Sequence, residues 1–139
     1  GITGHSMGGH GALTIAMSFP DRFASVSAFA PICNPMESDW GRKQFTAYLG
    51  ENTALWEPHD ATVLMREQGF PGPVLIDTGT ADQFGDLLKT EALAEAMVAR
   101  RQNGQVRMQP GYDHSYFFVS TFMEDHVSFH AQAMYGVDA

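Results

Sequence analysis

Residues 4–8 of the chain read Gly4-His5-Ser6-Met7-Gly8, with a glycine two positions before the serine and another two positions after it. This G-x-S-x-G pattern is typical of a sharp strand-to-helix turn that exposes a nucleophilic serine in strained backbone dihedrals. Side chains at the two outer positions would collide in such a turn, and glycine at both is expected to remove the collision. As a bare pentapeptide the pattern also occurs by chance, so a glycine-rich turn that happens to hold a serine is the alternative.

The segments around this turn agree with a strand before it and a helix after it. Residues 1–3 have the character of a strand end, and a helix is expected over residues 7–18, stopped by Pro20. The free N–H groups and the positive dipole at the start of that helix would point to the place where an oxyanion forms. Ser6 is therefore predicted to be a catalytic nucleophile.

Strands and helices alternate along the rest of the chain. Further strands are expected at residues 25–29, 74–77 and 106–109, and further helices at 40–49, 60–68, 86–101 and 115–134. Such alternation predicts a parallel sheet with helices on both faces, and the serine turn narrows this prediction to the α/β-hydrolase fold. We expect a single domain in which residues 31–72 form an irregular helical excursion beside the sheet, with Asp39 as the cap of the helix at 40–49.

The predicted acid and base follow from the order that this fold imposes. Nucleophile, acid and histidine come in that order, the last two on loops after later strands. Asp82 lies in the turn after the strand at 74–77, and His114 lies on the loop after the strand at 106–109. Asp77 belongs to the strand itself and Asp86 opens the next helix as a cap, while Asp113 is interpreted as a helix cap or a solvated charge.

The other five histidines do not have the placement of a base. His5 lies inside the turn, His10 lies in the helix behind it and His59 lies in the excursion. His126 and His130 are four residues apart on the last helix, the spacing of a metal pair, but no third ligand accompanies them. An ordinary helix face is the favoured interpretation, and no metal site is predicted.

Composition excludes several classes of function. The 139 residues carry 16 acidic and 8 basic side chains, a formal net charge of −8, which repels nucleic acid and anionic membrane surfaces. No apolar run approaches the roughly 18–20 residues that span a bilayer. Cys33 is the only cysteine, so no internal disulfide can form, which fits a cytoplasmic protein, and a packed thiol is its expected state.

Four segments together resemble the S-formylglutathione hydrolase family, also called esterase D. They are Gly-His-Ser-Met-Gly-Gly-His-Gly-Ala (4–12), Phe-Ala-Pro-Ile-Cys-Asn-Pro (29–35), Ala-Asp-Gln-Phe (81–84) and Gln-Pro-Gly-Tyr-Asp-His-Ser-Tyr-Phe-Phe (109–118). The resemblance implies hydrolysis of a glutathione thioester to glutathione and formate by a cytoplasmic enzyme without metal or cofactor, commonly a homodimer. It places the catalytic triad on Ser6, Asp82 and His114.

The resemblance also implies binding roles. One oxyanion donor would be the backbone N–H of Met7, and Trp40 matches a family tryptophan near the acyl pocket, although a core tryptophan would give the same pattern. Lys43 and Arg42 are candidates for binding the carboxylates of the leaving group, with solvated surface charges as the alternative. The segment 36–39, more acidic than the family pattern, is expected to border the site.

The family's chains are about twice as long as this one. The chain is therefore expected to be the C-terminal half of the domain and to need the preceding half, which supplies further strands, a second oxyanion donor and part of the substrate groove. Alternatives are another esterase or acyltransferase of the same fold, a non-catalytic fragment, and cysteine chemistry at Cys33, which has no partner histidine in a motif context.

Overall fold

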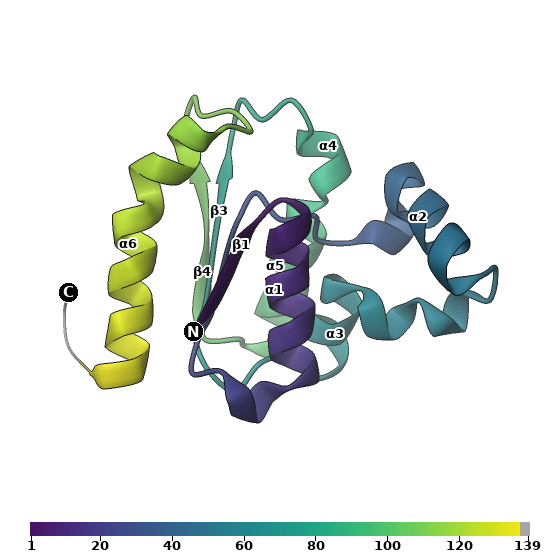
Figure 1. Ribbon diagram of the computed structural model, residues 1–139, viewed down its shortest axis with the longest axis horizontal. Helices are drawn as coiled ribbons and strands as arrows, with labels where there is room; N and C mark the ends of the chain where they lie inside the picture. Colours follow the sequence, from purple (N-terminus) through teal and green to yellow (C-terminus); the bar gives the residue numbers. More distant parts are fainter. Residues whose placement is uncertain (137–139) are drawn as a thin grey trace.

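The computed structural model describes residues 1–136 and has a four-stranded parallel sheet at its centre (Figure 1). The strands lie in sequence order: β1 (Ile2–His5), β2 (Val26–Phe29), β3 (Val74–Gly79) and β4 (Gly104–Gln109). A parallel neighbour can be reached only by a crossover, and crossovers of one hand that advance in one direction leave their helices on one face. Figure 1 shows this arrangement, which confirms the predicted fold class.

One face of the sheet is covered by the crossover helices and the other by the last helix. The crossover helices are α1 (Met7–Ser18), α3 (Ala61–Glu67) and α5 (Thr90–Arg100), and the last helix is α6 (Tyr116–Tyr135). The larger core cluster joins these crossover helices to the sheet, and a smaller one around Phe29 and Phe118 lies beneath α6. None of the helices within residues 1–136 has the length and hydrophobicity to cross a bilayer.

The segment between β2 and β3 divides into two parts. Helix α2 (Asp39–Leu49) stands away from the sheet, whereas α3 packs against α1 and α5 (Figure 1). Three short 3-10 turns, at Pro35–Glu37, Thr53–Leu55 and Glu57–His59, complete the segment. Asp60 caps α3, because its Oδ1 accepts hydrogen bonds from the backbone N–H groups of Thr62 and Val63 at 2.9 and 3.1 Å.

The structure corrects one predicted helix and the predicted cap of another. The helix expected over 86–101 is broken at Lys89, whose φ of 56° is left-handed, into α4 (Gly85–Leu88) and α5. Helix α2 is capped by Ser38, whose hydroxyl accepts from the N–H of Gly41 at 3.1 Å, and Asp39 is already inside the helix. Both errors are local, and neither moves a strand.

A buried polar layer lies between α6 and the sheet. The Asp77 carboxylate accepts hydrogen bonds from Arg107 at 2.6 and 2.7 Å, from Gln109 at 2.9 Å and from Nε2 of His126 at 2.7 Å. The face of α6 that carries His126 and His130 therefore turns inward, to hold the helix on the sheet. Residues 1–136 contain no group of three or more His, Cys, Asp or Glu side chains placed to hold a metal ion.

Stability is expected to fall in two stages as the pH falls. Burial lowers the pKa values of His10 and His130 to about 4 in the folded protein. The unfolded chain therefore binds more protons between about pH 6.5 and 4, and stability decreases across that window. Burial alone would raise the pKa of Asp77, but hydrogen bonds from His126, Arg107 and Gln109 outweigh it and lower the value to about 2. The stability that Asp77 contributes is present above about pH 4 and is lost as the pH falls towards 2.

Urea unfolding of the intact protein between pH 7 and 2.5 measures both stages. The variant His130→Gln, which cannot take up a proton in this range, should show a shallower first stage than the parent protein. Equal free energies of unfolding at pH 6.5 and 4.5 in the parent protein would contradict the expectation.

Candidate active site

Ser6 occupies the single residue between the end of β1 and the start of α1. Its backbone has a φ of 59° and a ψ of −117°, a conformation that costs a non-glycine residue roughly 1–3 kcal/mol. Hydrogen bonds hold it there: the N–H of Ser6 donates to the carbonyl of Phe29 at 2.9 Å, and the carbonyl of Ser6 accepts from the N–H groups of His10 and Ile32 at 3.1 and 3.3 Å. The strain predicted from the pentapeptide is present at this position.

The two glycines of the pattern differ in how closely other atoms approach them. A Cβ at Gly4 would lie 2.1 Å from the carbonyl oxygen of Gly8, so no other residue fits there without moving the backbone. A Cβ at Gly8 would meet nothing within 4 Å. The expected collision is therefore confirmed for Gly4 and is wrong for Gly8 within the described part of the chain.

Asp82 and His114 meet beyond the C-terminal ends of β3 and β4. Oδ2 of Asp82 lies 2.7 Å from Nδ1 of His114, and the side chains are 0% and 11% exposed. Oδ1 of Asp82 accepts from the N–H of Phe84 at 2.8 Å, which fixes the carboxylate in its turn. Because an ionised carboxylate can only accept, Nδ1 carries the proton and Nε2 of the neutral ring is left as a base.

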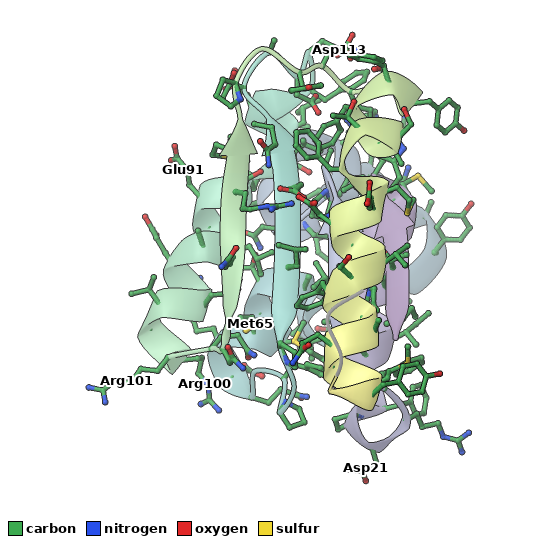
Figure 2. The ribbon with its side chains drawn as sticks, turned by 90° about the vertical axis from the view of Figure 1, so that its left-hand side faces the viewer. Asp21, Met65, Glu91, Arg100, Arg101 and Asp113 are labelled. Atoms are coloured by element: carbon green, nitrogen blue, oxygen red, sulfur yellow. The ribbon has the colours of Figure 1, made fainter. Side chains whose placement is uncertain are left out.

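The rejected acids are occupied elsewhere or exposed. Asp77 is buried in the polar layer beneath α6. Asp86 lies in the first turn of α4 without capping it, so the cap expected there was wrong. Asp113 is exposed at the end of the molecule to which the strands point (Figure 2). It does not cap α6, because Ser115 occupies that position, so the expected cap was wrong and the solvated charge remains.

Aromatic rings surround His114. The ring of His5 lies against it, tilted by 35° and with 4.7 Å between centroids, and Phe84 meets it edge-on at 5.1 Å. Trp40 of α2 stacks on Phe84 at 5.5 Å, so it reaches His114 through one intervening ring. The sequence did not predict the contacts of His5 and Phe84 with His114, although His5 directly precedes Ser6 and Phe84 lies two residues after Asp82.

A small cavity of about 130 Å³ opens between the start of α1 and α2. Met7, which follows Ser6, lines it together with His10, Ile32 and Trp40. A neutral His10 is fixed in the wall because its Nε2 accepts from the N–H of Ala61 at 3.2 Å. The structure therefore brings Met7 and Trp40 to one cavity beside the nucleophile turn.

The two basic residues of α2 are not brought to this cavity. Lys43 is exposed and does not line it. Arg42 forms an ion pair with Asp39 on its own helix and donates to the carbonyl of Met36 at 3.4 Å. Their predicted role in binding a leaving group stays a prediction.

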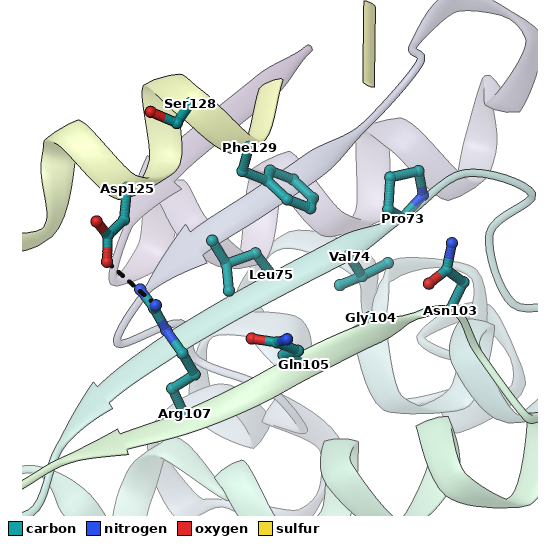
Figure 3. Close-up of a pocket in the computed structure, with 10 residues that line it drawn as sticks. All are labelled: Pro73, Val74, Leu75, Asn103, Gly104, Gln105, Arg107, Asp125, Ser128 and Phe129. Atoms are coloured by element: carbon teal, nitrogen blue, oxygen red, sulfur yellow. Dashed lines mark hydrogen bonds and ion pairs between the residues drawn. The ribbon is translucent and has the colours of Figure 1, made fainter. Parts of the chain in front are cut away.

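A larger groove of about 540 Å³ lies elsewhere on the molecule (Figure 3). It is lined by the first residues of β3 and β4 and by α6, including Leu75, Gln105 and Phe129. Its one cation, Arg107, is paired with Asp77 and, at 3.1 Å, with Asp125. Ligands of parallel α/β sheets bind beyond the carboxyl ends of the strands, where Ser6, Asp82 and His114 lie, so this groove is not the candidate active site.

Cys33 does not have the environment of a reactive thiol. It is fully buried, and its Sγ donates to the carbonyl of Pro31 at 3.3 Å. Burial, together with the negative charge of Asp60, raises the pKa of the Cys33 thiol. A nucleophilic thiolate needs a lowered pKa and access to solvent, so cysteine chemistry at this position is excluded.

Comparison with known proteins finds similarity to an esterase family and to S-formylglutathione hydrolases. A family model described as "Putative esterase" matches residues 1–129. The S-formylglutathione hydrolase of Paracoccus denitrificans is 70% identical over 134 residues, and that of Arabidopsis thaliana is 52% identical over 135 residues. A solved S-formylglutathione hydrolase structure from Agrobacterium tumefaciens superposes with a TM-score of 0.91 at 46% identity.

The coverage of these matches is unequal. Each of the three includes 96% of this chain but 48% of the relative, so the chain spans about half the length of the curated relatives it matches. A Staphylococcus aureus S-formylglutathione hydrolase structure, at 20% identity and a TM-score of 0.72, is similar in fold.

Proposed function

Because the chain belongs to the esterase family, we propose that it is the nucleophile-bearing half of a serine hydrolase that cleaves S-formylglutathione to glutathione and formate. The observation that carries the proposal is the 2.7 Å contact between Asp82 and His114 beside the strained turn of Ser6. The high identity to S-formylglutathione hydrolases supports the choice of substrate.

The proposed reaction has two halves. The hydroxyl of Ser6 attacks the formyl carbonyl while Nε2 of His114 takes the hydroxyl proton, and Asp82 stabilises the imidazolium. The N–H of Met7 donates to the oxyanion of the tetrahedral intermediate. Collapse breaks the carbon–sulfur bond, His114 returns the proton to the glutathione thiolate, and a formyl ester remains on Ser6. Water, deprotonated by His114, then attacks this ester, and the acyl–oxygen bond breaks to release formate while His114 gives the proton back to the oxygen of Ser6.

The cavity beside Met7 is the proposed acyl pocket. Trp40, 43% exposed, forms part of its wall, and its stacking on Phe84 ties that wall to the ring beside His114. Lys43 and Arg42 are proposed to bind the carboxylates of the glutathione leaving group along the outside of α2.

We also propose that activity requires the preceding half of the domain. Within residues 1–136, β1 pairs with β2 alone, so the nucleophile strand has an open edge that a further strand can fill. The proposed enzyme is cytoplasmic, acts without a cofactor or metal, and can form a homodimer.

Acyl selectivity tests the substrate. In the intact enzyme, kcat/KM for S-formylglutathione should exceed that for p-nitrophenyl acetate, and acetate should exceed butyrate by roughly tenfold or more, because extra methylenes overpack a small pocket. Trp40→Ala should narrow the gap between acetate and butyrate. A preference for octanoate esters with no cleavage of S-formylglutathione would contradict the proposed thioester substrate. It would not contradict the proposed catalytic triad.

A further inference from the structure

We infer that His5 is a positioning residue for the catalytic base, with its ring serving as the platform against which the face of His114 rests. The inference rests on the proposed function, because it assigns His114 the role of base. His5 is the last residue of β1 and directly precedes Ser6. A contact from His5 therefore places the base relative to the same strand end that carries the nucleophile.

The hydrogen bond that Nδ1 of His114 donates to Asp82 does not by itself fix the imidazole. It restrains Nδ1, but the ring can still swing about the axis of that bond, which moves Nε2 towards or away from Ser6. The ring of His5 lies 4.7 Å from that of His114 at a tilt of 35°, and Phe84 meets it at 83° and 5.1 Å, so two ring contacts restrain the imidazole in addition to the hydrogen bond. A misplacement of about 1 Å at a reacting group can lower the rate about 10²-fold.

The contact is one between rings and not a link in a hydrogen-bond chain. Nε2 of His5 is buried and has no hydrogen-bond partner among residues 1–136. Tyr116, at the start of α6, packs near the ring of His5 with 6.2 Å between centroids. His5, the last residue of β1, thus also contacts the start of α6. β1 precedes Ser6, and α6 follows His114.

The surroundings of His5 also favour its neutral form. Burial lowers the pKa of His5, the charge of His114 lowers it further, and Asp82 opposes both. This direction favours the uncharged ring of His5 beside the imidazolium that forms when His114 accepts the serine proton. Tyr116 is the other titratable group that faces His5.

The test compares His5→Ala with His5→Phe in the intact enzyme, with His59→Ala, an exposed histidine of the excursion, as the control. His5→Ala should lower kcat about 10- to 100-fold and change KM less than about threefold, because substrate binding is intact while the base is displaced. His5→Phe, which keeps a flat ring, should stay within about threefold of the parent kcat, and so should His59→Ala.

A fluorophosphonate probe separates this inference from the proposed function. The parent enzyme should be labelled at Ser6, and the labelling rate should fall in His5→Ala but not in His5→Phe. Absence of labelling in the parent would contradict the proposed function itself. If the parent is labelled, an unchanged labelling rate in His5→Ala, or an equal loss of labelling rate in His5→Phe, would contradict the positioning role of His5. If His5→Ala unfolds, His5→Leu gives the same comparison, since it fills the space without a ring.

Discussion

Replacing Ser6 by alanine should lower kcat of the intact enzyme by about 10⁴-fold or more while the protein remains folded. The loss is large because no other hydroxyl occupies the turn between β1 and α1. The fold should survive because alanine has the same Cβ as serine and the hydrogen bonds that hold the turn use only backbone atoms of residue 6. Steady-state hydrolysis of S-formylglutathione and circular dichroism measure the two effects.

The matched control is labelling at Cys33. A fluorophosphonate probe should label Ser6 in the parent protein and leave the buried thiol of Cys33 unmodified, since a protonated and inaccessible thiol does not react. A parental kcat in a pure Ser6→Ala preparation would show that Ser6 has only a structural role in the turn. Labelling at Cys33 would identify the thiol as the reactive group.

The parts of the fold that depend on local pattern could be predicted from the sequence. A serine between glycines, preceded by a strand and followed by a helix, indicated the turn, and apolar runs bounded by turn residues indicated the parallel strands. Parallel strands place their following loops at one edge of the sheet. That rule was sufficient to expect Asp82 near His114, and the structure places them 2.7 Å apart.

The features that were missed depend on contacts between distant residues. Nothing in the helical pattern over 86–101 signals the left-handed residue Lys89, which carries an ordinary helix-forming side chain. The four groups that donate hydrogen bonds to Asp77 come from β4 and α6, and no sequence pattern near Asp77 predicts them. Buried ion pairs of this kind are set by tertiary packing.

His5 illustrates a different limit. As the variable position of a G-x-S-x-G motif it carries no expected role, and its contact with His114 joins residues 109 positions apart. Alternation along β1 offers a signal, because Thr3 and His5 share one face of the strand, and the hydroxyl of Thr3 accepts a hydrogen bond from Ser27, which contacts His126 of α6. That signal places His5 on the side of α6 but does not predict its ring contact with His114.

Replacing Asp82 by asparagine should lower kcat of the intact enzyme roughly 10³–10⁴-fold through the wrong histidine tautomer. The structure gives the reason. The N–H of Phe84 donates to Oδ1 of Asp82, so an asparagine at this place would keep its carbonyl oxygen towards Phe84 and turn its NH₂ group towards His114. Nδ1 of His114 would then have to accept, and the proton would move to Nε2, which could no longer take the proton of Ser6.

Asp113→Asn is the matched control, because it makes the same chemical change one residue from His114 on an exposed side chain. It should leave kcat within about threefold of the parent value. Asp77→Asn provides a second comparison: it removes the charge that Arg107 neutralises in the polar layer, so its main effect should be a lower melting temperature. If Asp113→Asn proved more damaging to kcat than Asp82→Asn, Asp82 would not be the acid, and the 2.7 Å contact with His114 would be structural.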